Sequence, residues 1–256
     1  MQILGVRLDN VKVNEALERV RGFLFDNQQH LVASVNPEML VLAQKDLEFR
    51  QVLNKSDLNF ADGTGVVFAS YFLGAPLPQR IPGVDFVWQL CELAEKEDKK
   101  IFLLGGGNGV AAVAVSEITK RFPNLKIASG GDNLKFDDPT LIILVNNFAP
   151  QILLVAFGHG RQEKWLAKNL AQLPSVDVGM GVGGTFDFMA GRVRRAPKFF
   201  RVLGLEWSWR LITQPWRLKR IFTATAHFCY LVVKSRIKNN ESGSRKQDPP
   251  AGGFSS

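Results

Sequence analysis

The stretch KIFLLGGGNGVAAVAVSEITKRFPNLKIASG, residues 100–130, decides the fold class of this chain. It begins with an apolar run at 100–106, passes through a glycine-rich turn into an amphipathic segment at 108–121, and ends with a second apolar run at 125–130. Two strands joined by a helix of this length need a crossover connection, which places the strands parallel in one sheet. The segment therefore predicts a strand–helix–strand unit.

The same alternation of apolar runs and amphipathic segments extends over most of the chain, at residues 30–35, 84–97, 151–158, 161–172 and 176–183. We therefore predict an α/β fold over residues 1–190, with a mainly parallel sheet and helices on both faces. Ligands of such sheets bind beyond the carboxyl ends of the strands. Polar residues and glycines that directly follow an apolar run are therefore the candidate site residues.

Positive charge is concentrated in one segment of the chain. The 256 residues carry a formal net charge of +8, from 32 Lys and Arg against 24 Asp and Glu. Residues 191–240 hold 12 of the Lys and Arg and a single acid, Glu206. We predict that residues 191–238 form a basic, aromatic appendage of amphipathic helices, broken at Pro197 and Pro215. Its charge indicates an anionic partner: phosphate groups, a nucleic-acid backbone or an acidic membrane surface.

Composition excludes several classes of protein. A chain with 46% hydrophobic and 22% charged residues is neither collagenous nor wholly disordered. Cys91 and Cys229 form no disulfide or zinc pattern, which favours a cytoplasmic setting. The longest apolar run, 221–233, is shorter than the ~20 residues that span a bilayer. Residues 239–256 are polar and rich in Pro, Gly and Ser, which predicts a disordered tail.

Two polar residues follow predicted strands. Asn36 follows the run at 30–35, where its amide is suited to orienting a sugar or to capping a helix that begins at Pro37, and one residue can do both. Asp62 follows a second apolar run and precedes Gly63, so it is placed as a general base or as another helix cap.

Two glycine-rich turns also follow apolar runs. The turn that opens at Gly105 resembles a dinucleotide loop, but Val110 replaces the last glycine and no acidic residue closes the next strand. An NAD(P)-dependent oxidoreductase is therefore the weaker interpretation, and a turn that admits a nucleoside or diphosphate is the stronger one. The turn around Gly183 and Gly184 also indicates close approach of a ligand or of backbone. Asp187, just after it, either does chemistry or pairs with the arginines that follow.

A further polar segment follows the apolar run at 151–158. Gln162 and Glu163 fall in the first turn of the next predicted helix, where exposed N–H groups can receive a ligand oxygen. His159 precedes them, and a lone loop histidine is more often structural or solvated than catalytic. No D-x-D pair indicates Mg²⁺ or Mn²⁺, because Asp137 and Asp138 precede Pro139 and predict a helix start. We expect no metal and no other cofactor, with arginines stabilising any leaving diphosphate.

Five motifs occur in a fixed order: NPEMLVLA (36–43), ADGTGVV (61–67), RIPGVDF (80–86), GHGRQEKW (158–165) and GVGGTFDFMAGRVRRAPKFFRVLGLEWSWRL (181–211). In this order and at these separations they resemble the WecG/TagA/CpsF glycosyltransferases of bacterial surface-polysaccharide synthesis. The resemblance covers roughly residues 1–220.

This resemblance implies a Rossmann-like fold and a defined reaction. An N-acetylmannosamine-type sugar would move from a UDP donor to undecaprenyl-diphosphate-linked N-acetylglucosamine, with inversion and without a metal. The appendage would dock on the membrane, which implies a cytoplasmic, peripheral protein on the inner face of the cell membrane. A homo-oligomer is compatible with the sequence, and nucleic acid is not an expected partner.

The resemblance also implies roles for individual residues. Asp62 becomes the base for the acceptor hydroxyl, and Asn36 and Gln162 become active-site residues. Arg80 is implied to contact phosphate. The appendage arginines are implied to reach the donor or lipid diphosphate: Arg210, Arg217 and Arg220. We add Gly105, Gly183 and Gly184 as substrate-binding residues of the two glycine-rich turns.

One segment departs from the family pattern. Family members usually carry a proline and a lysine just before the QE pair, whereas this chain has Gly160 and Arg161, preceded by His159. The charge is kept at Arg161, and the departure bears on donor preference more than on reaction type. A third hypothesis, a non-enzymatic membrane or nucleic-acid binder, rests on the basic segment with Trp207, Trp209 and Trp216.

Overall fold

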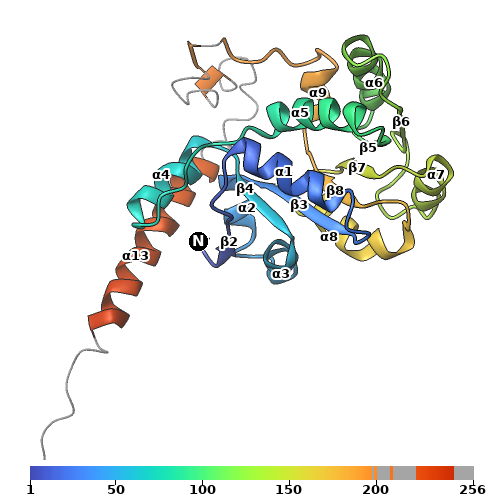
Figure 1. Cartoon of the computed structure of the whole chain (residues 1–256). Coiled ribbons are helices and arrows are strands. Elements are labelled where there is room, and N and C mark those ends of the chain that lie inside the picture. The colour runs from blue at the N-terminus through green and yellow to red at the C-terminus, as the bar shows by residue number, and fades with distance from the viewer. Residues whose placement is uncertain (198, 201–207, 210–222, 245–256) are drawn as a thin grey trace, which may run out of the picture.

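The structure is a computed structural model that describes residues 1–197, 199–200, 208–209 and 223–244 (Figure 1). Its centre is a six-stranded sheet in the order β4-β3-β8-β7-β5-β6, and all neighbouring strands are parallel. The strands are β3 (His30–Val35), β4 (Leu58–Ala61), β5 (Ile101–Gly105), β6 (Ile127–Gly130), β7 (Ile152–Ala156) and β8 (Val178–Gly181). A short antiparallel pair precedes them, β1 (Gln2–Ile3) and β2 (Val6–Arg7).

Helices cover both faces of this sheet. One face carries α1 (Val13–Phe23), α5 (Gly83–Lys96), α6 (Val110–Arg121) and α9 (Thr185–Met189). The other carries α2 (Pro37–Leu42), α3 (Leu47–Lys55), α4 (Thr64–Phe72), α7 (Thr140–Phe148) and α8 (Arg161–Asn169), which a 3₁₀ turn (Leu170–Gln172) extends. On β5, Ile101 and Leu103 enter the first core and Phe102 and Leu104 the second, as the alternation of a strand requires. The predicted fold class is confirmed.

The sheet register positions the candidate residues. The run at 30–35 forms β3 over its whole length, and the run at 100–106 contains β5. Val35, the last residue of β3, pairs with Ala61, the last residue of β4, and Val155 of β7 pairs with Gly181 of β8. The carboxyl ends of β4, β3, β8 and β7 therefore lie side by side at one edge of the sheet.

The described part of the predicted appendage returns to the α/β core. A π-helical turn (Thr223–His227) leads into α13 (Phe228–Ser244). The buried side chains of Phe228 and Val232 join the same apolar core as α2 and α4, and Figure 1 shows α13 running beside α4 and away from the sheet. Most of the segment between Pro197 and Thr223 lies outside the described residues.

The boundary of the predicted tail differs in the structure. We predicted a disordered tail from residue 239, but α13 continues to Ser244. The first glycine after Phe228 is Gly243, so nothing in this stretch interrupts the helix earlier. Within the described residues, no helix combines the length and apolar character needed to cross a membrane.

Candidate active site

A cleft of about 970 Å³ opens at the carboxyl ends of β3, β4, β7 and β8. The loops after these strands form its floor, and α2, α4, α9 and α13 supply its walls. The cleft is lined by six of the predicted site residues: Asn36, Asp62, Arg80, Gln162, Gly183 and Gly184. The sheet thus brings together motifs that are far apart in the sequence.

Asp62 is held in place at the end of β4. Its backbone N–H donates to the carbonyl of Val35 on β3, at 2.8 Å. Its carboxylate Oδ2 accepts hydrogen bonds from the backbone N–H of Gly83, at 3.2 Å, and from the hydroxyl of Ser34, at 3.3 Å. The Nε of Arg80 lies 3.9 Å from the other carboxylate oxygen. These contacts fix the orientation of a carboxylate that lines the cleft, as a general base requires.

Asn36 caps a helix and lines the cleft. Its Oδ1 accepts a hydrogen bond from the backbone N–H of Met39, at 3.1 Å, in the first turn of α2, whose first residue is Pro37. The predicted cap is confirmed. The amide nitrogen then lies 3.4 Å from Nε2 of His159, across the cleft floor.

His159 connects two residues of the NPE motif. Its Nδ1 lies 3.3 Å from Oε2 of Glu38, so the ring stands between that carboxylate and the amide of Asn36. A neutral ring that donates from Nδ1 and accepts at Nε2 satisfies both contacts. The sequence pattern predicted no role for Glu38 and favoured a structural or solvated role for His159. The one local signal for this pair was the position of Glu38 beside Asn36.

Gln162 and Glu163 are buried beside the cleft. Oε1 of Gln162 accepts from the backbone N–H of Gly183, at 3.1 Å, and its Nε2 donates to Glu163, at 2.7 Å. Glu163 also accepts from the backbone N–H of Gly160, at 2.7 Å. Burial raises the pKa of Glu163, an effect that the hydrogen bond from Gln162, the neighbouring His159 and the backbone hydrogen bonds partly offset. Both the oxygen and the nitrogen of the Gln162 amide are thus hydrogen-bonded within the protein. The bond to Gly183 positions the turn after β8.

The two glycine-rich turns contribute differently. Gly183 and Gly184 line the cleft, but Gly105 does not. At the φ of +83° that Gly105 adopts, an added Cβ would lie 2.6 Å from the ring of Phe157, so this glycine makes room for an aromatic side chain. Of the four glycines that the structure describes in this turn, Gly106 alone lines the cleft. This placement weakens the dinucleotide interpretation further.

The segment that departs from the family pattern has a backbone suited to glycine. Gly160 adopts a φ of +82°, and proline cannot do so because its ring fixes φ at about −65°. An added Cβ there would also lie 2.8 Å from Leu42. Arg161 lines the cleft, with its guanidinium carbon 5.9 Å from the centre of the Phe136 ring. The chain therefore keeps a positive charge here on a loop whose backbone conformation excludes proline.

The cleft contains a second aspartate, Asp187 on α9. Among the described residues no arginine pairs with it, because Arg195 forms its ion pair with Asp85 and Arg192 donates to the carbonyl of Asn108, at 2.7 Å. The described residues also include no group of three or more His, Cys, Asp and Glu that could hold a metal ion. The predicted diphosphate-binding arginines of the appendage lie outside the described residues: Arg210, Arg217 and Arg220.

A wall of the cleft comes from the C-terminal helix, which the sequence pattern did not predict. Side chains of α13 and of the turn before it line the cleft: Thr225, Phe228, Cys229, Val232 and Val233. Their placement follows from the docking of α13 on α2 and α4, so no local sequence pattern predicts it.

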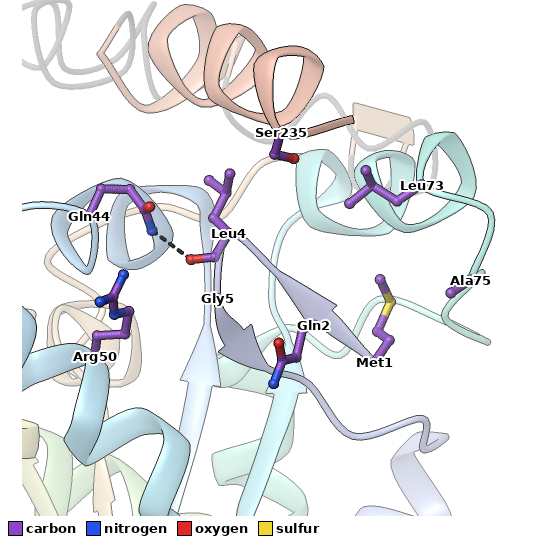
Figure 2. A pocket seen from close by; sticks show the side chains of 9 residues that line it. All are labelled: Met1, Gln2, Leu4, Gly5, Gln44, Arg50, Leu73, Ala75 and Ser235. Carbon is purple, nitrogen blue, oxygen red and sulfur yellow. Dashed lines mark hydrogen bonds between the residues drawn. The ribbon is translucent and has the colours of Figure 1, made fainter. Parts of the chain in front are cut away.

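A smaller cavity of about 620 Å³ lies apart from the cleft, between the β1–β2 pair, the end of α4 and α13 (Figure 2). It is lined by Met1, Gln2, Leu4, Gly5, Gln44, Arg50, Leu73, Ala75 and Ser235. The side chain of Gln44 donates to the carbonyl of Leu4, at 2.7 Å, and Ser235 reaches the cavity from α13. None of the predicted site residues that the structure describes lines this cavity, and we assign it no chemistry.

Known proteins resemble this chain over nearly its whole length. The model of the Glycosyl transferase WecG/TagA/CpsF family matches residues 1–242. The N-acetylglucosaminyldiphosphoundecaprenol N-acetyl-beta-D-mannosaminyltransferase of Staphylococcus aureus (strain NCTC 8325 / PS 47) is 33% identical over 241 residues, which are 93% of this chain and 94% of that protein. The protein of the same name from strain MRSA252 has the same identity and coverage.

Proposed function

Because the chain belongs to the WecG/TagA/CpsF family of glycosyl transferases, we propose that it transfers an N-acetylmannosamine-type sugar to undecaprenyl-diphosphate-linked N-acetylglucosamine. The sugar and the acceptor follow the name of the staphylococcal relatives, and the UDP donor is our inference from the class of reaction. The observation that carries the proposal is the single cleft that gathers Asp62, Asn36 and Arg80 from three separate motifs.

In this proposal Asp62 is the general base. Its carboxylate takes the proton from the acceptor hydroxyl as that oxygen attacks C1 of the sugar. The bond between C1 and the diphosphate breaks on the opposite face and its electron pair leaves with UDP, so the configuration at C1 inverts. The hydrogen bonds from Gly83 and Ser34 support this role because they hold the carboxylate in one orientation in the cleft.

We further propose that guanidinium groups, without a metal ion, stabilise the leaving UDP. Arg80 and Arg161 line the cleft, and the appendage would add Arg210, Arg217 and Arg220. Arginine suits a diphosphate because its planar fork donates two parallel hydrogen bonds. A lysine in place of an arginine keeps the positive charge but cannot form the two parallel hydrogen bonds. A loss of activity in Arg220→Lys would support such a contact, and full activity would argue against it.

The remaining cleft residues bind or position the substrates. Asn36 offers its amide nitrogen to the sugar while its oxygen caps α2. Gln162 acts as a positioning residue, since its amide holds the backbone of Gly183. Gly183 and Gly184 admit the diphosphate closely, and Gly106 takes the role predicted for Gly105 because it is the residue that lines the cleft.

The lipid of the proposed acceptor places the reaction at a bilayer surface. We propose a peripheral enzyme on the inner face of the cell membrane, held there in part by the basic segment 191–238. Its partners would be the UDP-sugar, the polyprenyl-diphosphate-linked acceptor and anionic lipid.

Turnover of the full chain with a panel of UDP-sugars tests the proposal. The acceptor is N-acetylglucosamine on a short-chain lipid diphosphate, and the readout is release of UDP. We expect release with UDP-N-acetylmannosamine and none with UDP-glucose. No release with any donor, together with nicotinamide-cofactor binding in calorimetry or salt-dependent duplex binding, would favour the oxidoreductase or the non-enzymatic binder instead.

A further inference from the structure

Helix α4 has an unusual outer surface. The segment from Gly63 to Gln79 contains no charged residue. One side of α4 is buried in the core through Val66 and Ala69, whereas the opposite side exposes Phe68 (73%), Tyr71 (61%) and Phe72 (45%). A helix that is apolar on all sides is normally enclosed by protein or lies in a membrane. The described residues therefore leave much of the outer face of α4 exposed.

Helix α13 continues the same surface. Its exposed apolar residues Tyr230, Val233 and Ile237 are spaced three and four residues apart, so they share one face of the helix. The guanidinium carbon of Arg236 lies 4.7 Å from the centre of the Phe72 ring, which joins the two helices at this surface. Figure 1 shows α4 and α13 side by side at one end of the molecule.

These two helices carry a large share of the exposed apolar side chains. Six of the twelve large hydrophobic side chains exposed in the described part of the chain lie on α4 and α13. The charged residues of α13 between Phe228 and Ile237 are Lys234 and Arg236, both positive. Aromatic side chains flanked by Lys and Arg are typical of helices that lie at the interface of an anionic bilayer.

The apolar surface also reaches the active-site cleft. Phe68, Phe72 and Val233 are exposed and at the same time line the cleft. A bilayer against α4 and α13 would thus meet the mouth of the cleft directly. This continuity favours lipid as the occupant over a second protein chain, which would cover the mouth.

We propose that α4 and the outer face of α13 form one docking surface for an anionic bilayer, with the aromatic side chains of α4 seated in the lipid interface and Lys234 and Arg236 against lipid phosphates. Helix α4 then supplies an anchor from outside the basic appendage, to which α13 with Lys234 and Arg236 belongs. The orientation of the cleft toward a lipid-linked acceptor rests on the proposed function, but the docking is measurable without turnover.

Vesicle binding of the full chain tests this surface. The probe is a vesicle of equal parts phosphatidylglycerol and phosphatidylcholine, and the variants are Tyr71→Asp and Ile237→Asp, neither of which lines the cleft. Ile143→Asp on α7 is the matched control, because Ile143 is 58% exposed but lies on a different helix. We expect Tyr71→Asp to weaken binding about tenfold, since it removes an interfacial aromatic side chain and adds a charge that anionic lipid repels. The control should bind like the wild type.

Three results would overturn the proposal. Vesicle binding could be unchanged in the Tyr71→Asp, Ile237→Asp double variant. The Ile143→Asp control could also lose as much vesicle binding as Tyr71→Asp does. Alternatively, sedimentation could show that the double variant turns a dimer into a monomer without affecting vesicle binding, which would assign the surface to a second copy of the chain. Failure of the proposed function would instead appear as absent UDP release from the wild type, with vesicle binding intact.

Discussion

The carboxylate of Asp62 accepts a hydrogen bond from the backbone N–H of Gly83, 3.2 Å away, in the first turn of α5. The two residues come from different motifs, and the hydroxyl of Ser34 shares the same carboxylate oxygen. A Cβ on residue 83 would lie 2.9 Å from that hydroxyl and 3.4 Å from the carboxylate. Glycine at this position thus allows the helix end to approach the proposed base.

We predict that Gly83→Ala lowers kcat about tenfold, because the methyl group displaces the Ser34 hydroxyl and disturbs Asp62, and small displacements of a reacting group cost up to about a hundredfold. UDP release measures the effect. The matched variant is the Gly83→Ala, Ser34→Ala double change, which removes the displaced hydroxyl and should be as active as Ser34→Ala alone. Wild-type activity in Gly83→Ala would show that this contact does not matter.

Asp62→Asn should abolish most of the transfer while keeping the fold. The amide oxygen can still accept from Gly83, but the side chain can no longer take a proton, and a general base contributes about 10²–10⁴ to the rate. UDP release and circular dichroism, measured on the same preparation, separate activity from folding. Undiminished transfer by a folded variant would remove Asp62 from the role of base.

Gly181→Ala should destabilise the protein. An added Cβ on this buried strand residue would lie 2.6 Å from both Nε2 of Gln162 and Oε1 of Glu163, and overpacking of this kind costs about 1–3 kcal/mol. Gly22→Ala on α1 is the control, since its Cβ would meet nothing within 4 Å and alanine favours a helix by up to about 1 kcal/mol. Urea unfolding compares the two. Equal stability of both variants would contradict the tight packing around Gln162.

The stability of the protein should depend on pH through Glu163. Burial raises the pKa of this carboxyl, so the folded chain holds its proton more tightly than the unfolded chain does. Its contribution to the free energy of unfolding is therefore largest below the ordinary carboxyl pKa and falls as pH rises through the raised value. Glu163→Gln cannot ionise, so its stability relative to wild type should improve between pH 5 and pH 8. Urea unfolding at both pH values tests this. The same difference in free energy of unfolding between variant and wild type at the two pH values would refute it.

His159 and Glu38 should act on Asn36 as one unit. The ring lies between the Glu38 carboxylate and the Asn36 amide, at 3.3 and 3.4 Å, so removing either partner releases the same amide. We predict that His159→Ala lowers kcat/KM about tenfold, as expected for a misplaced substrate-positioning group. In a double-mutant cycle, Glu38→Ala should add little to His159→Ala. Fully additive losses would show that the two residues act separately.

Local features of the fold were readable from the sequence because they depend on neighbouring residues. The apolar run of β3 and the helix that begins at Pro37 were both placed correctly, since strand patterns and helix caps involve residues only a few positions apart. The cleft could also be anticipated in part. Asn36 and Asp62 each follow a strand, and a parallel sheet necessarily collects such residues at one edge.

Other features depended on which elements pack together. Gln162 was expected in the active site and lines the cleft, but its burial and its hydrogen bond to Gly183 could not be read from the sequence. Gly105 was expected in the cleft, but the ring of Phe157 takes the space beside it. Such hydrogen bonds and packing contacts join residues that are far apart in the sequence. Their distance in space cannot be read from their spacing along the chain.

The sequence by itself determined the class of the sheet, the residues at its carboxyl edge and, through five ordered motifs, the family. Only the tertiary structure decided that β8 lies between β3 and β7, that His159 meets Asn36 across 123 residues of chain, and that α13 returns to α4 to complete a wall of the cleft. The physical reason is that periodicity and capping are local, whereas strand order and helix docking are set by which apolar faces bury one another.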